Sequence, residues 1–321
     1  MSKKRIGLFL GLLIIALLIT QLAAGCAGSD KAGTAQAEKP TGTYYFLTAN
    51  LQDPFYIPGI KGFTQSGVDL GIKTEVVGPQ ENSLSEQLKT LEALIAKPDT
   101  EGIYYQPVDW SAGEPLIKEA IAKGIPFVQG MQDSPGGSRQ AFIGSDNVIL
   151  GNKAAEWIAK MTNCSGAVGA IGNPGDPVLI RMDAMLVRLA EICPNIKTIP
   201  FVTDEPTLAS GVATIGAYMA ANPDMTLFWY ADGVSGQIAP FWHDQQAAGV
   251  TVQFLATDMP PATLQAVKDG VFVGTVGQDT YTEEYWGLKL TYALSLGQRV
   301  PDTILMAPIL IDKGNVDQFI E

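Results

Sequence analysis

Histidine and clustered positive charge are scarce in this chain. Its 321 residues include one histidine and three cysteines, and 33 Asp and Glu outweigh 21 Lys and Arg for a formal net charge of −12. No basic cluster follows Arg5, whereas nucleic-acid binding depends on clustered Lys and Arg. A Cys/His cluster of the zinc-binding kind is also missing, and His243 is expected to be a surface or packing residue of a helix. We therefore expect no nucleic acid, no metal and no cofactor.

The motifs of several enzyme classes are missing as well. The sequence contains no Gly-x-Ser-x-Gly, no Walker loop, and no Gly-x-Gly-x-x-Gly after its first expected strand. The adjacent carboxylates Glu283 and Glu284 fall in a segment expected to be helical, where they are interpreted as part of a solvated face. The chain is therefore predicted not to be an enzyme, and an enzyme on the same scaffold is the disfavoured alternative.

The first 25 residues differ in kind from the rest. A positive segment, Lys3–Arg5, precedes the charge-free apolar run Ile6–Thr20, which is shorter than the roughly 20 residues that span a bilayer. Residues 1–25 are therefore predicted to be a signal peptide, and a retained membrane helix is the alternative.

Small residues lead up to Cys26, and "AAGC" resembles the lipobox of bacterial lipoproteins. Leu22 lies one place further from the cysteine than in the usual pattern. The resemblance implies an acylated Cys26 and an exported protein anchored to the cell membrane, facing the periplasm or the cell exterior. Residues 26–42 are small, polar and aperiodic, and we expect them to form a tether.

Two cysteines remain beyond this segment, Cys164 and Cys193. In an exported protein an even pair of cysteines favours a disulfide. The alternative is two unpaired thiols.

Strand-like and helical segments alternate from residue 43 onward. Residues 43–48 are rich in aromatic and β-branched side chains, and Ser83–Lys97 combines a capping box with leucines at helical spacing. The alternation restarts near Asn147, and Asp176 is expected to cap the helix over residues 176–192. Two successive β-α-β-α runs predict an α/β fold with two doubly wound, Rossmann-like parallel sheets.

Two large aromatic residues follow the first expected strand directly. In "ANLQDPFYIPG", Phe55 and Tyr56 come just after an Asp-Pro step. Loops that leave the carboxyl ends of strands line the ligand crevice of open α/β sheets. We therefore expect this aromatic pair to face a ligand.

The order and spacing of several short motifs resemble the ribose-binding type of periplasmic binding protein (type I fold), the ligand-capturing subunits of sugar ABC importers. The motifs are "DPFY", "IPFV", "GSDN", a strand–loop–helix that contains Arg181, "ADG", "ATD" and "VGQD". The resemblance implies two lobes joined by three crossings near residues 145–147, 277–279 and 307–309. The N-terminal lobe would comprise residues 43–145 plus 279–307, and the C-terminal lobe residues 146–278 plus 308–321.

The same resemblance implies a set of ligand-binding residues. Phe55 and Tyr56 match the family's stacking pair, and Arg181 matches its cleft arginine. Asp258 and Gln278 end strands, where their side chains suit sugar hydroxyls. The ligand-binding residues that it implies are Asp53, Phe55, Tyr56, Trp110, Gln132, Arg181, Asp232, Asp258 and Gln278.

Several of these residues have structural alternatives. For the aromatic pair the alternative is packing beneath its own loop, and for Asp53 and Asp258 it is capping of the next helix. For Arg181 it is a surface salt bridge with Asp183 or Glu191.

The chain departs from the family pattern in two places. Met131 and Gln132 stand where sugar binders typically have an Asp-Arg pair, and Ala231 stands where an Asn is common. With Trp110 added, we expect a pocket that is less charged and more aromatic than a ribose site. The ligand stays open among a pentose or other small sugar, a deoxysugar, a polyol, a nucleoside and a furanosyl signalling molecule.

The function that the resemblance implies is capture of a small sugar or polyol by a monomer that delivers it to the membrane permease of an ABC importer. A chemoreceptor-coupled sensor on the same fold is an alternative. A sugar-responsive transcription regulator is disfavoured, because the chain has an expected export signal and no basic helix-turn-helix.

Overall fold

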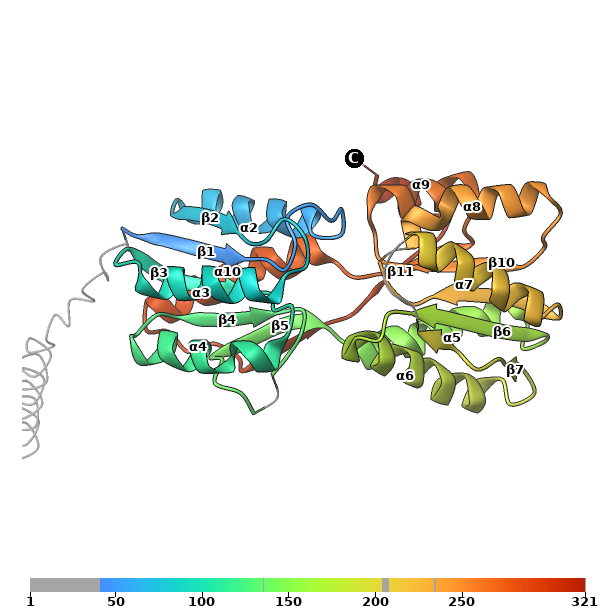
Figure 1. Ribbon diagram of the computed structural model, residues 1–321, viewed down its shortest axis with the longest axis horizontal. Coiled ribbons are helices and arrows are strands. Elements are labelled where there is room, and N and C mark those ends of the chain that lie inside the picture. Colours follow the sequence, from blue (N-terminus) through green and yellow to red (C-terminus); the bar gives the residue numbers. More distant parts are fainter. Residues whose placement is uncertain (1–40, 135, 204–207, 234, 321) are drawn as a thin grey trace, which may run out of the picture. The chain divides into compact units, whose positions relative to one another are not determined.

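The structure is a computed structural model that describes residues 41–134, 136–203, 208–233 and 235–320 (Figure 1). The expected signal peptide, the acylation at Cys26 and nearly all of the tether lie outside the described residues. Within those ranges, no helix combines the length and the apolar character needed to cross a bilayer.

The first sheet is wholly parallel. Its strand order is β12-β5-β4-β3-β1-β2. Its strands are β1 (Thr43–Leu47), β2 (Lys73–Val77), β3 (Thr100–Tyr105), β4 (Phe127–Gly130), β5 (Ala141–Ser145) and β12 (Thr303–Met306). Because both faces of such a sheet are covered, its inner strands are largely apolar, and β1 and β5 are buried over their whole length.

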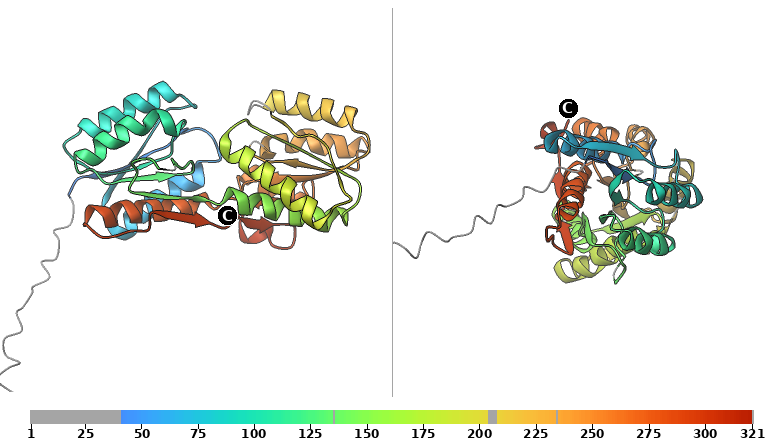
Figure 2. Two further views of the ribbon diagram at one scale, coloured as in Figure 1. Left: turned by 90° about the horizontal axis from the view of Figure 1, so that it is seen from below. Right: turned by 90° about the vertical axis from the view of Figure 1, so that its left-hand side faces the viewer.

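Helices cover both faces of this sheet, as Figure 2 shows. Alternate residues of β1 point to opposite faces, so Tyr44 and Phe46 join one core cluster and Tyr45 and Leu47 join the other. The first cluster packs under α2 and α10, and the second under α3 and α4. The helices are α2 (Ile57–Leu70), α3 (Leu84–Ala96), α4 (Trp110–Ala122) and α10 (Thr280–Ser295).

The second sheet is parallel except at one edge. Its order is β13-β11-β10-β9-β6-β7, with the short β8 also paired to β6. The strands are β6 (Ala167–Gly172), β7 (Lys197–Thr198), β8 (Val202–Thr203), β9 (Met225–Tyr230), β10 (Gln253–Thr257), β11 (Gly274–Gly277) and β13 (Ile309–Ile311). The prediction of two doubly wound parallel sheets is confirmed, apart from β13, which runs antiparallel to β11.

Helices also cover both faces of the second sheet. The core clusters place α5 and α6 against one face and α7, α8 and α9 against the other. The helices are α5 (Asn147–Thr162), α6 (Asp176–Ile192), α7 (Leu208–Ala221), α8 (Ser235–Ala247) and α9 (Pro261–Asp269), followed by the 3-10 turn η1 (Val316–Gln318). The expected cap of α6 was wrong by one residue, because Gly175 is the N-cap and Asp176 already lies in the first turn.

The chain passes between the two sheets at three places (Figure 1). Ser145 ends β5 in the first sheet, and α5 of the second lobe begins at Asn147. The chain returns between Gly277 and Thr280, and crosses again between Met306 and Ile309. Each departing strand ends at the carboxyl edge of its sheet, and β13 is antiparallel because it enters the second sheet from that sheet's carboxyl edge. The loops at the two carboxyl edges are therefore joined by the crossings.

Cys164 and Cys193 are joined by a disulfide, which spans a separation of 29 residues. Cys164 follows the end of α5 and Cys193 caps the end of α6. The bridge therefore ties together the ends of two helices that pack on the same face of the second sheet, beside β6.

Reduction of this disulfide should lower the stability of the protein. Closing a loop of about 30 residues restricts the unfolded chain, which corresponds to about 3–4 kcal/mol in the chain-entropy model. We expect the free energy of unfolding, measured by denaturant titration of the chain from Ala27 onward, to fall by about this amount in reductant.

The Cys164→Ser/Cys193→Ser double variant serves as the control, since reductant should not change its stability. An equal effect of reductant on the variant and on the wild-type chain would contradict the prediction.

Candidate functional site

The aromatic loop after β1 is shaped by short polar contacts. The Asn50 side-chain oxygen accepts hydrogen bonds from the backbone N–H groups of Gln52 and Asp53 at 2.9 and 3.1 Å. Asp53 Oδ1 in turn accepts from the N–H of Phe55 at 2.9 Å. These bonds fix the turn that presents Phe55 and Tyr56, whose rings meet edge to face at 5.1 Å. One carboxylate oxygen of Asp53 is therefore engaged in a hydrogen bond within its own loop.

Asp258 follows β10 at the carboxyl edge of the second sheet and is 2% exposed. Its backbone is left-handed, with φ at 66°, a conformation that few residue types other than glycine adopt readily. The backbone is held there by bonds from Asp258 N–H to Val276 O (3.0 Å) and from Thr275 Oγ1 to Asp258 O (2.7 Å). Backbone strain that is held in place by several surrounding hydrogen bonds is typical of functional sites.

The Asp258 carboxylate accepts a hydrogen bond of 2.6 Å from Gln278 Nε2. Burial raises the pKa of Asp258 to about 6, and the charge of Arg181 and the bond from Gln278 oppose this rise. The protonated and ionised forms of Asp258 are therefore both populated near pH 6. The two predicted ligand residues Asp258 and Gln278 are direct partners.

Arg181 lies in α6 and is buried. Its guanidinium donates to Asn147 Oδ1 at 3.1 and 2.7 Å and to the carbonyl oxygen of Ala231 at 3.0 Å. The expected alternative of a surface salt bridge is wrong, because these acceptors are neutral and internal. Burial lowers the pKa of Arg181, and nearby carboxylates, Asp258 first, oppose the shift. The arginine is thus fixed in place before any ligand arrives.

Asp232 follows β9 and is also buried. Its Oδ2 accepts hydrogen bonds from the backbone and side chain of Asn173, at 2.8 and 3.2 Å. Asn173 itself follows β6, the neighbouring strand. Two adjacent strand ends therefore present a linked carboxylate and amide.

Residues of the two lobes meet at this edge. A Cβ atom added to Gly233 would lie 2.9 Å from Asp258 Oδ2 and 3.3 Å from the ring of Phe55. Burial raises the pKa of the Tyr56 hydroxyl, and the charges of Asp53, Glu284 and Asp258 raise it further. The aromatic pair from the first lobe and Asp258 from the second are therefore neighbours.

Seven of the nine predicted ligand residues come together in this way. The contacts, or the mutual effects on pKa, join Asp53, Phe55, Tyr56, Arg181, Asp232, Asp258 and Gln278. A pocket of about 410 Å³ beside them is lined by Phe55 and Gln278 and by mostly apolar residues such as Met259 and Pro260.

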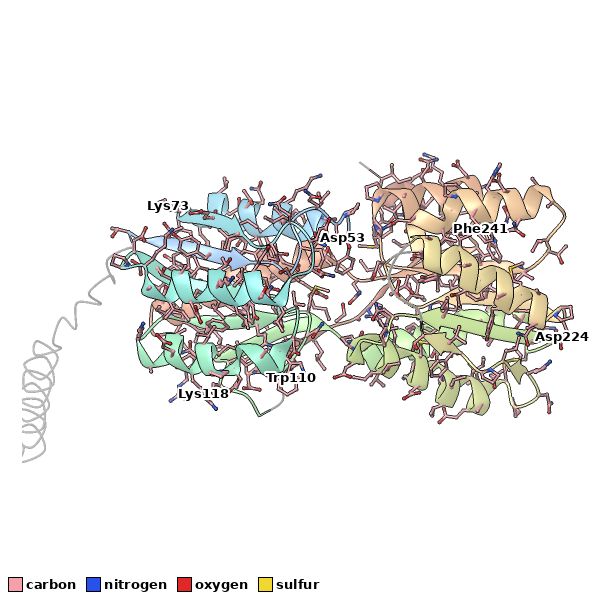
Figure 3. All side chains as sticks on the ribbon, viewed as in Figure 1. Asp53, Lys73, Trp110, Lys118, Asp224 and Phe241 are labelled. Atoms are coloured by element: carbon pink, nitrogen blue, oxygen red, sulfur yellow. A yellow bond between two sulfur atoms is a disulfide. The ribbon has the colours of Figure 1, made fainter. Side chains whose placement is uncertain are left out.

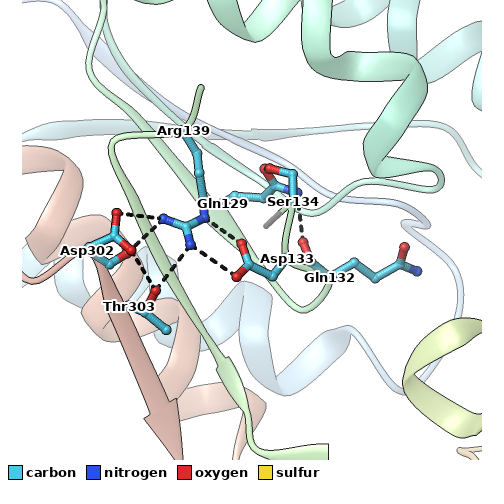
Figure 4. A network of polar contacts seen from close by, with 7 residues as sticks. All are labelled: Gln129, Gln132, Asp133, Ser134, Arg139, Asp302 and Thr303. Carbon is cyan, nitrogen blue, oxygen red and sulfur yellow. Dashed lines mark hydrogen bonds and ion pairs between the residues drawn. The ribbon is translucent and has the colours of Figure 1, made fainter. Parts of the chain in front are cut away.

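The structure does not bring Trp110 and Gln132 into this group. Trp110 is the first residue of α4, and Figure 3 shows it well apart from Asp53. The backbone of Gln132 joins a local network, with Gln129 Nε2 donating to its carbonyl oxygen at 2.7 Å. Figure 4 shows its side chain extending away from that network. Their ligand contacts stay predictions without structural support.

The same loop contains an Asp–Arg pair that the motif comparison missed. Arg139 donates two bonds to Asp133, at 2.5 and 3.0 Å, and further bonds to Asp302 and Thr303 (Figure 4). Thr303 begins the edge strand β12. The pair therefore fastens the loop between β4 and β5 to the start of β12 rather than facing the ligand edge.

Glu283 and Glu284 were expected to be solvated, and this was wrong. Both are 1% exposed. Ser145 Oγ donates to Glu283 Oε1 at 2.5 Å, and Gln106 Nε2 donates to Glu284 Oε1. Their helix packs against the first sheet, and its first turn follows the crossing at the carboxyl edge. Asp279 at the crossing caps this turn by accepting from Thr282 N–H.

Sequence reasoning also missed several residues that position the predicted ones. Asn147, Asn173, Gln106 and Ser145 all follow or end strands, or open a helix, at the carboxyl edges. This position in the sequence could have identified them, since polar residues directly after buried parallel strands converge on one edge of the sheet.

The comparisons with known proteins agree with this geometry. A family model described as a periplasmic binding protein domain matches residues 44–299. The D-allose-binding periplasmic protein of Escherichia coli is 26% identical over 269 residues, which cover 77% of this chain and 82% of that protein. The ribose import binding protein of Bacillus subtilis is 30% identical over 128 residues, or 40% of this chain and 41% of that protein.

Solved structures of the same fold lie close to this one. The sugar-binding protein of a Bacillus halodurans sugar ABC transporter superposes with a TM-score of 0.81 at 22% identity, covering 86% of this chain and 99% of that one. A periplasmic solute-binding protein of Actinobacillus succinogenes, solved with bound D-allose, gives 0.80 at 21% identity, with coverage of 87% and 100%. These likenesses establish the type I fold.

The family match and the fold define an extracytoplasmic solute-binding protein. Because the family model spans most of the described residues, the chain belongs to the periplasmic binding protein family. This family consists of solute-binding proteins.

The buried carboxyl groups predict how stability depends on pH. Burial raises the pKa of Glu283 from 4.5 to about 7 and that of Asp258 from 3.8 to about 6. Because the folded state holds these protons more tightly, both groups favour folding at low pH, and this contribution is lost as pH rises from about 4 to about 7. We expect the free energy of unfolding of the ligand-free protein to lose roughly 2–4 kcal/mol from these groups between pH 5 and pH 8.

Denaturant titrations across this range measure the dependence. Glu283→Gln should clearly reduce it, whereas Glu92→Gln, on the exposed face of α3, should leave it unchanged. A Glu283→Gln variant with the full wild-type dependence would refute the assignment.

Proposed function

We propose that this protein captures a small sugar or sugar-like molecule between its two lobes and delivers it to the membrane permease of an ABC importer. The proposal rests above all on one arrangement, the buried group of Arg181, Asp258 and Gln278 beside Phe55 of the other lobe. Carboxylate, guanidinium and amide groups match the donors and acceptors of sugar hydroxyls, and an aromatic ring covers the C–H face of a sugar ring. The ligands named for relatives, D-allose among them, support this class.

Capture works by closure of the lobes about the three crossings. The lobes that move are residues 43–145 plus 279–307 and residues 146–278 plus 308–321. A ligand that contacts both lobes binds the closed arrangement more tightly than the open one, and this difference in affinity shifts the population towards closure. The closed face then docks on the permease.

The setting is the outer side of the cell membrane. Acylation of Cys26 anchors the protein, and residues 26–42 give the globular part its reach. The protein acts as a monomer and carries out no chemistry on its ligand. Support comes from the export-type N-terminal sequence and from the absence of the common nucleophile and nucleotide-binding motifs in the sequence.

A thermal-shift screen tests the ligand class directly. The chain from Ala27 onward is screened against sugars, polyols and nucleosides, since a ligand that binds the folded state raises the melting temperature. We expect stabilisation by at least one sugar. Stabilisation by nucleosides alone would replace the sugar proposal with a nucleoside receptor.

Asp258→Asn should abolish ligand-dependent stabilisation while preserving the fold. Asparagine tolerates the left-handed backbone of this position and has nearly the same shape, but it lacks the charge and accepts fewer hydrogen bonds. We expect affinity for the sugar, measured by titration calorimetry, to fall by about 100-fold, which corresponds to about 2.7 kcal/mol. Asp183→Asn, on the exposed surface of α6, is the matched control. Wild-type affinity in Asp258→Asn would count against the site.

Phe55→Ala should weaken binding without changing the ligand's identity. Loss of a stacked ring removes about 0.5–1.5 kcal/mol beyond the area that it buries, so we expect an affinity loss of about tenfold or more. Val68→Ala, at a side chain that is 68% exposed, should bind as the wild type does. Equal affinities for the wild type and Phe55→Ala would place the aromatic pair outside the ligand contact.

A further inference from the structure

The first turn of α10 carries two buried carboxyl groups that the proposed sugar contacts do not use. Glu283 and Glu284 follow the crossing at Gly277–Thr280 and are each 1% exposed. Ionisable side chains are almost never buried to this degree without partners, because the charged form loses its hydration. The hydrogen-bond partners of each residue therefore indicate the role of the pair.

Glu283 is satisfied within the protein, but Glu284 is not. Glu283 accepts from Ser145, and both this bond and the nearby charge of Arg181 oppose the rise in its pKa that burial causes. Glu284 receives Gln106 Nε2 on Oε1, whereas its Oε2 is buried and has no hydrogen-bond partner among the described residues. A buried acceptor with no donor is costly, and ligand donors are one way to supply it.

Glu284 lies at the ligand edge of its lobe rather than deep in the core. Gln106, its donor, directly follows β3 and also accepts a bond from Thr48 Oγ1, which follows β1. On its other side is α2, where a Cβ added to Gly59 would come within 2.8 Å of the Glu284 side chain. The Tyr56 hydroxyl feels the charges of both Glu284 and Asp258. The carboxyl group therefore lies near the aromatic pair, at the same edge of the first lobe.

Carboxyl groups outnumber basic groups in this space. We call Asp53, Asp232, Asp258, Glu283 and Glu284 the carboxyl cluster. Among the groups whose charges act on Asp258 and Glu283, the positive one is Arg181, and its guanidinium is already bonded to Asn147 and Ala231. Burial raises the pKa of Glu284 well above its ordinary value, the charge of Glu283 raises it further, and the bond from Gln106 opposes the rise.

A neutral sugar leaves this imbalance in place when the lobes close around it. An ammonium group has three donors and no acceptor, so it satisfies the free oxygen of Glu284 and offsets the charge of the carboxyl cluster at once. We propose that the site takes a sugar bearing a protonated amino group, and that Glu284 is the specificity-determining residue that receives this group. The inference rests on the proposed sugar-binding function and names the class of sugar.

Matched pairs of ligands test the inference on the chain from Ala27 onward. Titration calorimetry at pH 6.5 compares D-glucosamine, D-galactosamine and D-mannosamine with glucose, galactose and mannose, and with the N-acetylated amino sugars, which keep the ring substitution but lose the charge. We expect at least one amino sugar to bind about tenfold or more tightly than both its parent and its N-acetyl form. The preference should shrink at higher salt, as expected for an electrostatic contact.

The Glu284→Gln variant tests whether Glu284 causes the preference for amino sugars. It keeps the size of the side chain and the contact with Gln106, and we expect it to reduce the amino-sugar preference to about onefold while changing affinity for the parent sugar much less. Glu92→Gln should keep the wild-type preference. Melting of each ligand-free variant reports whether it folds, and the wild-type ligand comparison decides the inference even if Glu284→Gln does not fold.

The outcomes separate this inference from the function on which it rests. Binding of neutral sugars with no preference for any amino sugar would overturn the inference and leave the proposed function standing. A wild-type preference that survives in folded Glu284→Gln would overturn the role of Glu284. Failure of every sugar, neutral or amino, to bind the folded chain would overturn the proposed function as well.

Discussion

The site depends on one constraint, namely that buried parallel strands bring their carboxyl ends to a common edge. In this chain each sheet has such an edge, and the three crossings leave and enter there. Side chains far apart in sequence, such as Phe55 and Asp258, become neighbours because both follow strands at these edges. The same constraint explains why β13 alone is antiparallel in its sheet: the chain enters that sheet from its carboxyl edge.

Charge burial is the physical feature that sets this site apart from an ordinary polar surface. Arg181, Asp258 and Glu283 are removed from water, yet neutral groups such as Asn147 and Gln278 hold them in fixed orientations. Such an arrangement destabilises the fold, because charged groups lose their hydration. It favours binding, because the polar groups are already oriented before the ligand arrives. The strained backbone of Asp258 belongs to the same pattern.

The two lobes divide the work of recognition unequally. The second lobe supplies the ordered charges, with Arg181 bonded to its neighbours and Asp258 held by Gln278. The first lobe supplies the aromatic pair and, through the first turn of α10, the carboxyl groups of Glu283 and Glu284. A ligand that contacts both lobes stabilises the closed arrangement relative to the open one, and hinge closure requires this difference. The disulfide between Cys164 and Cys193 lies in the second lobe and stiffens the packing of α5 and α6.

Local sequence determined a large part of this protein. Apolar strands, helix periodicity and the strand-exit position of Phe55, Asp232 and Asp258 predicted the fold class and most of the residues that come together, because these signals act over a few residues. The burial of Glu283 and Glu284 was decided only by the tertiary structure. Whether a helical carboxyl group is solvated or buried depends on the surface against which its turn packs, and here that surface includes Ser145 and Gln106, which lie more than a hundred residues away in sequence.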